Sequence, residues 1–365
     1  MLAQDVFYQD AFYMAKALQL ARLGRFSTDP NPRVGCVLVK DGVIMGEGFH
    51  VKAGQAHAEI MALNNAVTAQ GATAYVTLEP CSHQGKTPPC CDALINAGIS
   101  RVVAAMQDPN PLVSGRGLEQ LKAAGIEVVC GVLEADASLL NRGFIKRMTE
   151  QRPFVRSKLA MSLDGRTAMA SGESKWITSQ AARADVHQIR AESSAILTGI
   201  NTVLADDPAL TARIDEAVEQ PVRVVLDSNL NMPVTAQMAK LAGRSLILTC
   251  SSDVIKRQAL QAEGFEVYTL ADNNGQLDLQ VVLSFLAEQQ INEVLVEAGS
   301  ILNAALLAED LVDEWIIYMA PCVLGDQGRG LFSMPTLQSM ADKKTLRFQD
   351  VRAIGPDLKL TLTRP

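Results

Sequence analysis

The stretch LEPCSHQGKTPPCCDALI, residues 78–95, contains three of the chain's seven cysteines. Cys81 follows a β-rich run, and Cys90 opens a helical pattern. A thiolate is favoured at the beginning of a helix, because the unpaired N–H groups and the helix dipole stabilise negative charge. Eight residues separate the two thiols, so the stretch lacks the two-residue gap of common zinc motifs. It nevertheless resembles half of a metal site.

His57 and Glu59 supply the other half. They stand in the tripeptide HAE, near the beginning of a helical pattern over residues 56–68. One imidazole and two thiolates would leave the fourth position of a tetrahedral zinc open for water, which is typical of a catalytic site. Zinc lowers the pKa of bound water, and a nearby glutamate can carry the proton to a departing amine. Catalytic zinc is favoured over a closed structural site, which would leave Glu59 without a role, and over a redox dithiol, which needs C-x-x-C spacing.

Length and composition predict a soluble protein with two domains. A chain of 365 residues is too long for one ordinary core, and 48% hydrophobic residues argue against disorder. Residues 1–24 have the pattern of an amphipathic helix and not of a signal peptide, and no apolar run approaches the roughly 20 residues that span a bilayer. An odd number of cysteines predicts reduced thiols and a cytoplasmic protein. The formal net charge of −7 favours small-molecule substrates over nucleic acid.

Strand and helix patterns alternate along the chain, which predicts α/β folds with helices packed on mixed or parallel sheets. Two β-rich runs flank Asp41-Gly42, as in a hairpin. The charge-rich stretch 141–153 ends in proline, so we place the boundary near residue 150 and expect domains 1–150 and 151–365. Four further cysteines lie in apolar runs and are expected to be small core residues: Cys36, Cys130, Cys250 and Cys322.

The second half lacks the G-x-G-x-x-G fingerprint of dinucleotide-binding proteins. Residues 293–307, EVLVEAGSILNAALL, instead predict a strand, a turn at Gly299 and a helix whose first N–H groups are suited to a phosphate. Such a turn alone is weak support, since many βα units contain a glycine without a ligand. Residues 158–179 and 198–213 gather charged and polar side chains in loops at strand ends, more than an ordinary core requires.

HAE followed by P-C resembles the zinc-dependent cytidine deaminases, although their second motif is P-C-x-x-C and here eight residues intervene. The complete segment, with NPRVG at 31–35 and DPNPLVSGRG at 108–117, resembles one family that has this longer spacing. That family is the bifunctional riboflavin biosynthesis deaminase/reductase. The resemblance continues through the second half to PCVLG at 321–325 and is least specific over about 231–290. It implies a cytidine-deaminase-like three-layer α/β/α domain followed by a dihydrofolate-reductase-like α/β domain.

The resemblance also implies site residues in both halves. It assigns His57, Cys81 and Cys90 to Zn²⁺ and Glu59 to proton transfer. The implied substrate contacts of the deaminase are Asn31, His50, His83, Lys86, Asp108 and Asn110. The implied NADPH contacts are Ala160, Trp176, Thr202, Asp206, Ser228, Gly299, Ser300, Ile301, Leu302 and Asn303. The implied substrate contacts of the reductase are Lys158, Ser174, Arg190, Leu210, Arg213 and Glu297.

Several of these residues also have plainer interpretations. Lys86 would suit a sugar phosphate, but composition alone equally allows a solvated lysine. Asn31 and Asp108 precede prolines, as turn residues do, and a single Trp176 is more often packing than a nicotinamide contact. Arg190 and Arg213 together make chemical sense as a phosphate clamp. Lys158 and Glu297 would polarise the sugar end that accepts hydride.

The implied activity comprises two steps of riboflavin synthesis. The first is hydrolytic deamination of 2,5-diamino-6-ribosylamino-4(3H)-pyrimidinone 5′-phosphate. The second is NADPH-dependent reduction of the ribosyl group of 5-amino-6-(5-phosphoribosylamino)uracil to ribityl. A nucleic-acid deaminase is disfavoured by the acidic balance, and a zinc-stabilised nucleotide sensor without turnover stays an alternative. We expect pyrimidine ribose phosphates as partners, no nucleic acid and no membrane, and a homo-oligomer is compatible with the sequence. Cys91, about 100° further round the helix than Cys90, should face the core.

Overall fold

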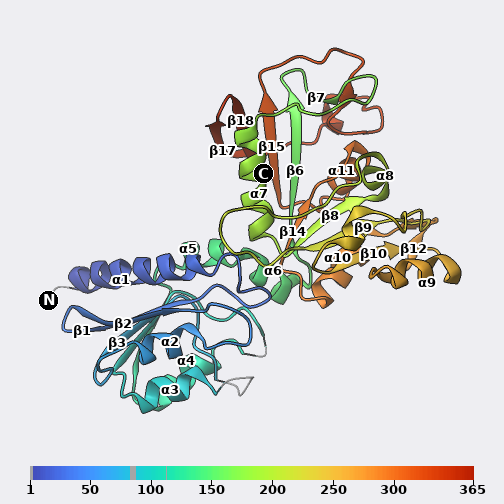
Figure 1. Ribbon diagram of the computed structural model, residues 1–365. Helices are drawn as coiled ribbons and strands as arrows, with labels where there is room; N and C mark the ends of the chain where they lie inside the picture. Colours follow the sequence, from blue (N-terminus) through green and yellow to red (C-terminus); the bar gives the residue numbers. More distant parts are fainter. Residues whose placement is uncertain (1–2, 83–87, 112) are drawn as a thin grey trace. The chain divides into compact units, whose positions relative to one another are not determined.

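The computed structural model describes residues 3–82, 88–111 and 113–365 (Figure 1). The chain divides into two compact units, Met1–Gln151 and Arg152–Pro365. Within the described residues, no helix combines the length and the apolar character needed to cross a bilayer.

The first unit is built on a five-stranded sheet in the order β2-β1-β3-β4-β5. β1 runs antiparallel to both β2 and β3, whereas β3, β4 and β5 are parallel. Its strands are β1 (Gly35–Lys40), β2 (Val43–Phe49), β3 (Thr73–Val76), β4 (Arg101–Ala104) and β5 (Glu127–Cys130). Its helices are α1 (Ala3–Leu23), α2 (Ala58–Asn64), α3 (Cys90–Asn96), α4 (Arg116–Ala123), α5 (Glu134–Leu140) and α6 (Arg142–Glu150).

Alternating side chains of β1 enter two separate cores, one on each face of this sheet. Cys36 and Leu38 pack with residues of α2, α3 and α4, while Val37 and Val39 pack with residues of α1 and α5. The sheet therefore lies between two helical layers, as Figure 1 shows for the lower part of the view. The expected three-layer α/β/α arrangement is confirmed.

The turn between β1 and β2 has the backbone that the Asp41-Gly42 pair predicts. Both residues have positive φ, 49° for Asp41 and 78° for Gly42. Positive φ at both central positions is the requirement of a type I′ turn, whose twist matches that of the two strands it joins. The predicted hairpin is confirmed.

Helix α2 packs closely on β2 because glycine faces it. A Cβ atom added at Gly48 would lie 2.5 Å from the backbone nitrogen of Ala62 and 2.6 Å from the carbonyl oxygen of Ala58. Any side chain there would push the helix away from the sheet. The glycine therefore helps to set where the first turn of α2, which carries Glu59, lies.

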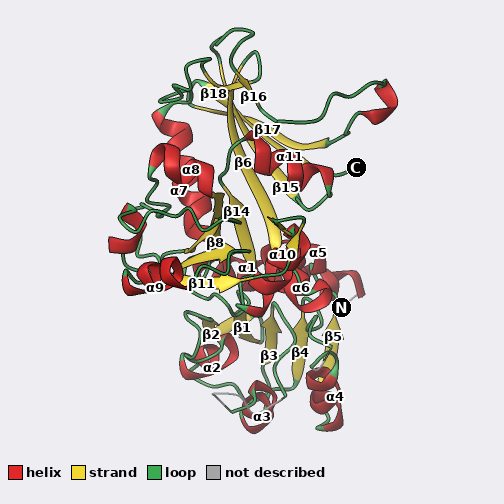
Figure 2. Cartoon of the chain, turned by 90° about the vertical axis from the view of Figure 1, so that its right-hand side faces the viewer, coloured by secondary structure: helices red, strands yellow, loops and turns green. Residues whose placement is uncertain are grey.

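The second unit contains a nine-stranded sheet in the order β11-β10-β9-β8-β14-β6-β15-β18-β17. In this order, the strands from β11 to β15 all run parallel to one another. β18 runs antiparallel to β15, and β17 runs antiparallel to β18 (Figure 2). The sheet strands are β6 (Phe154–Ser162), β8 (Ala195–Gly199), β9 (Val222–Leu226), β10 (Ser245–Thr249), β11 (Glu266–Thr269), β14 (Glu293–Val296), β15 (Glu314–Ala320), β17 (Arg347–Ile354) and β18 (Asp357–Thr363). Two short pairs are β7 (Arg166–Ala168) with β16 (Arg329–Gly330), and β12 (Asp272–Asn273) with β13 (Gln276–Leu277). The helices are α7 (Gln180–Glu192), α8 (Ile200–Asp206), α9 (Val254–Ala262), α10 (Leu279–Glu288) and α11 (Ser300–Ala308), with 3₁₀ turns η1 (Gln237–Lys240) and η2 (Met340–Asp342).

The parallel strands direct their carboxyl ends to one edge of the sheet. Helix α8 begins directly after β8, and α11 begins four residues after β14 ends. Ser228 lies two residues beyond the end of β9. Ligands of open α/β sheets bind at this edge, because the loops that follow the strands converge there.

Stretch 141–153, where we placed the boundary, consists mostly of α6, which buries Gly143 and Lys146. One expectation about local structure is wrong. Cys130 is exposed and not a core residue. It ends β5, the edge strand of its sheet, so fewer neighbours cover it than cover the buried Cys36. Cys250 and Cys322 are half-buried.

Candidate functional site

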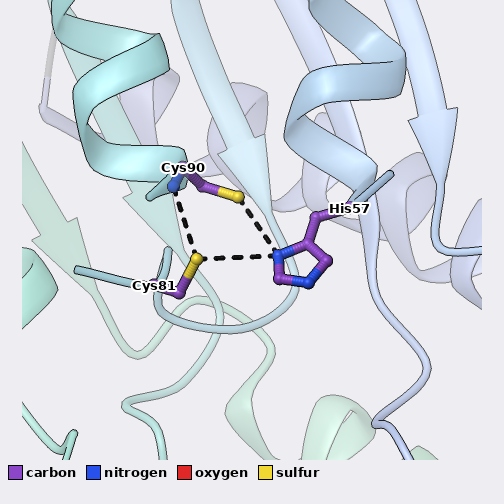
Figure 3. Close-up of side chains that lie close together, drawn as sticks. All are labelled: His57, Cys81 and Cys90. Carbon is purple, nitrogen blue, oxygen red and sulfur yellow. Dashed lines mark hydrogen bonds between the residues drawn. The ribbon is translucent and has the colours of Figure 1, made fainter. Parts of the chain in front are cut away.

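Three side chains that could bind a metal ion lie close together in the first unit (Figure 3). His57 immediately precedes α2, Cys90 is the first residue of α3, and Cys81 lies on the loop after β3. The Nδ1 atom of His57 is 3.3 Å from the Sγ atom of Cys90 and 3.6 Å from that of Cys81. All the candidate ligand atoms lie within 4.8 Å of one another. Residues that are distant in the sequence thus form one compact donor set.

The donor set is suited to a soft divalent cation. A hydrogen bond from Cys90, together with His57, lowers the pKa of the Cys81 thiol to about 4, although burial opposes this. The backbone N–H of Cys90 also donates to the Cys81 sulfur, at 3.3 Å, as the beginning of a helix allows. Thiolate and imidazole ligands at these separations fit zinc.

Glu59 lies in the first turn of α2, two residues after His57, and only 3% of it is exposed. Burial, reinforced by the negative charge of Cys81, raises the pKa of this carboxyl to about 7. Its side chain interacts with Cys90. The structure therefore brings a buried carboxyl next to the three candidate ligands, in the place that the HAE motif predicts.

Asn31 and His50 lie beside this cluster. The ring of His50 is 5.3 Å from the ring of His57, edge to face. Its Nδ1 atom is 3.1 Å from the carbonyl oxygen of Ala56, and its Nε2 atom is 3.0 Å from the side-chain nitrogen of Asn31. Because the carbonyl can only accept, Nδ1 carries the proton and Nε2 accepts from Asn31. His50 therefore holds the Asn31 amide in one orientation.

A buried carboxylate that the sequence analysis did not single out shapes the loop after β4. Glu79 accepts backbone N–H groups of Asp108 (3.0 Å), Gly115 (2.9 Å) and Gly117 (2.8 Å). The Asp108 carboxylate in turn accepts the N–H of Asn110, at 2.8 Å. Two of the predicted substrate contacts, Asp108 and Asn110, thus belong to a loop that Glu79 holds. Glu79 lies in the same EPC tripeptide as Cys81, and this proximity in the sequence was the available indication.

Glu79→Gln should destabilise the first unit. The glutamine side chain would point its NH₂ group, itself a donor, at backbone N–H groups that donate to the Glu79 carboxylate. Charge-assisted hydrogen bonds worth roughly 1.5–3 kcal/mol each would be lost. We expect a loss of about 3 kcal/mol, or a fall in Tm of roughly 10 °C, measured by calorimetry of the full chain. Glu119→Gln, at an exposed position on α4, should change stability by less than about 0.5 kcal/mol. If the two variants unfolded at the same temperature, Glu79 would not be the residue that stabilises the loop after β4.

Cys91 faces the core, as its position on the helix predicts. It is fully buried, and its thiol contacts the carbonyl oxygens of Pro80 at 3.3 Å and Gly117 at 3.5 Å. It packs with Leu94 and Leu121 in the core under α3 and α4. The remaining two predicted deaminase contacts, His83 and Lys86, lie outside the described residues.

The second unit contains a cavity of about 1690 Å³. Most of the predicted reductase residues line it: Lys158, Ala160, Ser174, Trp176, Arg190, Thr202, Asp206, Arg213, Ser228, Glu297, Gly299, Ser300, Ile301 and Leu302. They come from β6, α7, α8, α11 and the loops after β7, α8, β9 and β14. The tertiary structure therefore brings together around one cavity residues as distant in the sequence as Lys158 and Leu302.

Two predicted residues are not part of the cavity wall. Leu210 is buried in a core with Ile196 and Val203. Asn303 is fully buried, and its amide nitrogen donates to the carbonyl oxygens of Ala298 (2.8 Å) and Gly299 (3.1 Å). Asn303 therefore fastens the turn that precedes α11 from behind the cavity wall.

Glu297 is the centre of a charged group in the cavity. Its carboxylate accepts from Arg190 through two nitrogens, at 2.5 and 2.9 Å, and lies 3.5 Å from Nζ of Lys158. Burial alone would raise the pKa of Glu297, but the two cations lower it to about 2. Arg190 also donates to the carbonyl oxygen of Thr211. Three of the five N–H groups of Arg190 are thus bound within the protein, and its part in a phosphate clamp stays a prediction.

Trp176 and Asp206 lie at more exposed positions of the cavity. Trp176 is 70% exposed, and the guanidinium of Arg183 stacks 4.6 Å from its ring centre. Asp206 forms an ion pair with Lys175 at 3.2 Å. The exposure of Trp176 is inconsistent with ordinary core packing and leaves its ring available to a ligand.

The sequence analysis missed several cavity residues, among them Arg183, His187 and Tyr318. Arg183, His187 and Arg190 recur at spacings of four and three along α7, so the helical period would have placed them on one face. No comparable indication existed for Tyr318, which lies in an apolar strand.

Family models match both halves of the chain. The family model for the cytidine and deoxycytidylate deaminase zinc-binding region matches residues 8–106, and that for the RibD C-terminal domain matches residues 153–360. The riboflavin biosynthesis protein RibD of Escherichia coli is 51% identical, over 97% of this chain and 99% of its own length. That of Haemophilus influenzae is 49% identical, over 97% of each chain.

Solved structures show the same relationship over the whole chain. Acinetobacter baumannii RibD superposes with a TM-score of 0.92, at 46% identity, covering 98% of this chain and 99% of that one. A diaminohydroxyphosphoribosylaminopyrimidine deaminase/5-amino-6-(5-phosphoribosylamino)uracil reductase from Thermotoga maritima gives 0.87, at 36% identity and the same coverage. The resemblance inferred from the motifs is confirmed, including the bifunctional activity and the need for zinc and NADPH. This chain belongs to the RibD family of riboflavin biosynthesis enzymes, which join a zinc-binding deaminase domain to a reductase domain.

Proposed function

We propose that the first unit deaminates 2,5-diamino-6-ribosylamino-4(3H)-pyrimidinone 5′-phosphate and that the second unit reduces the ribosyl group of the product with NADPH. The observation that carries the proposal is the pair of separate sites, a buried carboxyl beside three zinc ligands and a cavity lined by cations. The name of the Thermotoga maritima relative states both activities. The chain would act in the cytoplasm on small molecules. Its net charge of −7 argues against a nucleic-acid partner, because nucleic acids carry negative charge themselves.

His57, Cys81 and Cys90 would hold the zinc ion. When bound, zinc supplies the Lewis acidity that makes a water nucleophilic near neutral pH. The ligands lie at the beginnings of α2 and α3 and on the loop that precedes α3, so two helices packed on the sheet fix their positions. Three protein ligands leave one position for water or substrate, as in other catalytic zinc sites.

Glu59 would carry the protons of the deamination. Its carboxyl takes a proton from the attacking water and passes it to the departing amine, which leaves as ammonia. Burial at 3% exposure shields the carboxyl from bulk water, and α2 holds it near the ligands. Asn31 would meet the substrate in the single orientation that His50 imposes.

Cofactor and substrate would bind side by side in the cavity of the second unit. The backbone N–H groups at the beginning of α11, after Gly299, are suited to a cofactor phosphate, and Trp176 is exposed to receive a ring. NADPH, when bound, supplies the hydride. Lys158 and Glu297 would lie at the sugar end, where the carboxylate holds Nζ of Lys158 in place to polarise the accepting group.

Glu297→Gln tests the reductase assignment. The neutral amide would release Lys158 and Arg190 from their ion pairs, so we expect NADPH oxidation to fall by roughly 100-fold while ammonia release is unchanged. The measurement is nicotinamide absorbance in the presence of the deaminated substrate. Glu288→Gln, at an exposed position on α10, is the matched control and should behave as the unmodified protein. If the unmodified protein oxidised no NADPH, the reductase proposal would be wrong.

A further inference from the structure

The loop before β1, which carries Asn31, is held from two sides. On one side the Asn31 amide contacts His50, whose ring lies beside that of His57. On the other side the loop contacts the junction of α5 and α6. This junction lies beyond residue 106, where the match to the deaminase zinc-binding region ends. None of its residues was among the site residues implied by the sequence.

Asn141 lies between the two helices and forms a reciprocal pair with the backbone of Arg33. The N–H of Arg33 donates to Oδ1 of Asn141 at 2.8 Å, and Nδ2 of Asn141 donates to the carbonyl oxygen of Arg33 at 2.9 Å. The side-chain amide therefore pairs with Arg33 as a neighbouring β-strand would. Only 4% of Asn141 is exposed, so removing the amide would leave two backbone groups without a buried partner.

The side chain of Asn141 is not used to cap its own helix. Asn141 is the N-cap residue of α6, where an asparagine side chain ordinarily accepts an N–H group of the first turn. All of α6 is described, and Asn141 makes no such bond to it. The amide is directed instead to a loop 108 residues away in the sequence.

Two arginines add to this hold on the loop. Nη1 of Arg33 donates to the carbonyl oxygen of Leu140 at 3.2 Å, and Nη2 of Arg147 on α6 donates to the carbonyl oxygen of Pro30 at 3.2 Å. The loop is therefore fixed one residue before Asn31 and two residues after it. A side chain that is already held in its binding position loses less conformational freedom when a ligand binds.

We propose that Asn141 is a positioning residue of the deaminase, which fixes the loop 30–33 so that Asn31 meets the pyrimidine phosphate in one place. The proposal rests on the function proposed above, in which Asn31 contacts the substrate. Asn141 acts through Asn31 and not on the reacting atoms. The α5–α6 junction thus becomes part of the device by which the first unit recognises its substrate.

The kinetics of ammonia release test the proposal on the full chain. In Asn141→Ala, KM for the pyrimidine phosphate should rise roughly tenfold while kcat stays within about threefold, because binding is weakened equally before and during the reaction. Asn141→Asp keeps the acceptor for the Arg33 N–H but loses the donor, so its KM should lie between the two. Asn64→Ala, exposed at the end of α2, is the matched control and should behave as the unmodified protein. NADPH oxidation, unchanged in all three variants, shows that the chain is folded.

A double-mutant cycle separates positioning from a merely structural role. Asn31→Ala should raise KM by itself, and adding Asn141→Ala should raise it little further, because no Asn31 amide is left to position. Independent effects that multiply would overturn the proposal, as would an unchanged KM in Asn141→Ala. An unchanged KM in Asn31→Ala would refute the substrate contact and the proposal with it.

Hydrogen exchange gives a readout that needs no turnover. The amide of Arg33 should exchange roughly tenfold faster in Asn141→Ala than in the unmodified protein or in Asn64→Ala, because its acceptor is gone. Mass spectrometry of the peptide covering residues 28–35 measures the rate. Equal exchange would refute the hold on the loop, whether or not the protein releases ammonia. Faster exchange in a protein that released no ammonia would place the failure in the proposed function and not in the contact between Asn141 and the loop.

Discussion

Glu59→Gln should reduce ammonia release by about 1000-fold while zinc content, folding and NADPH oxidation are preserved. The amide has nearly the shape of the carboxyl, so the buried position at the beginning of α2 keeps its packing. It cannot, however, accept a proton from water and return it to the departing amine. The measurement is ammonia released from the pyrimidine phosphate by the full chain, with metal content determined on the same sample.

Glu47→Gln is the matched control for this variant. Glu47 is exposed on β2, the strand against which α2 packs, so the same chemical change there should leave ammonia release within about twofold of the unmodified protein. If Glu59→Gln retained its ammonia release, proton transfer by Glu59 would be wrong. The zinc-stabilised sensor would stay an alternative for the first unit only if the unmodified protein released no ammonia.

The adjacent cysteines should respond in opposite ways to the same substitution. Cys90→Ser removes a thiolate from the donor set, because a hydroxyl is a far weaker zinc ligand, and should abolish zinc binding and ammonia release. Cys91→Ser should retain the metal, because its thiol contacts only Pro80 and Gly117 among the polar partners given by the structure. A cost of about 1 kcal/mol in stability is expected for Cys91→Ser, since a buried thiol is replaced by a more polar group.

Metal analysis of the two purified variants distinguishes these outcomes. NADPH oxidation should be unchanged in both, which shows that a loss of zinc did not arise from general unfolding. Zinc retained by Cys90→Ser and lost by Cys91→Ser would reverse the assignment of the ligand. Loss from both variants would mean that packing under α3, and not ligation alone, decides the metal affinity.

Local patterns predicted the features that depend on neighbouring residues. Asp41-Gly42 predicted a hairpin because few residue pairs tolerate two positive φ values, and the observed turn has both. Cys91 was expected to face the core because the helical period turns it away from Cys90, and it is buried. The HAE motif indicated that an imidazole and a carboxyl would lie together at the beginning of one helix, and His57 immediately precedes α2 while Glu59 lies in its first turn.

Features that depend on distant neighbours were predicted less well. Cys130 lies in an apolar run, yet it is exposed because β5 happens to be an edge strand. The sequence did not show that Arg190 pairs with Glu297, more than 100 residues away. Nor did it show that the buried amide of Asn303 donates to the carbonyl oxygen of Gly299. None of these partners can be inferred from residues nearby in the chain.

The sequence by itself determined the chemistry of the deaminase site, because one histidine, two thiols and a glutamate at family spacing restrict the possible reactions more than the possible folds. It also indicated two α/β halves, since their periodicities are local. Only the tertiary structure decided which charges are already paired. That outcome depends on the order of parallel strands, which brings β14 beside β6 and β8 and so places Glu297 between Lys158 and Arg190. Ion pairing is set by distances through space and not along the chain.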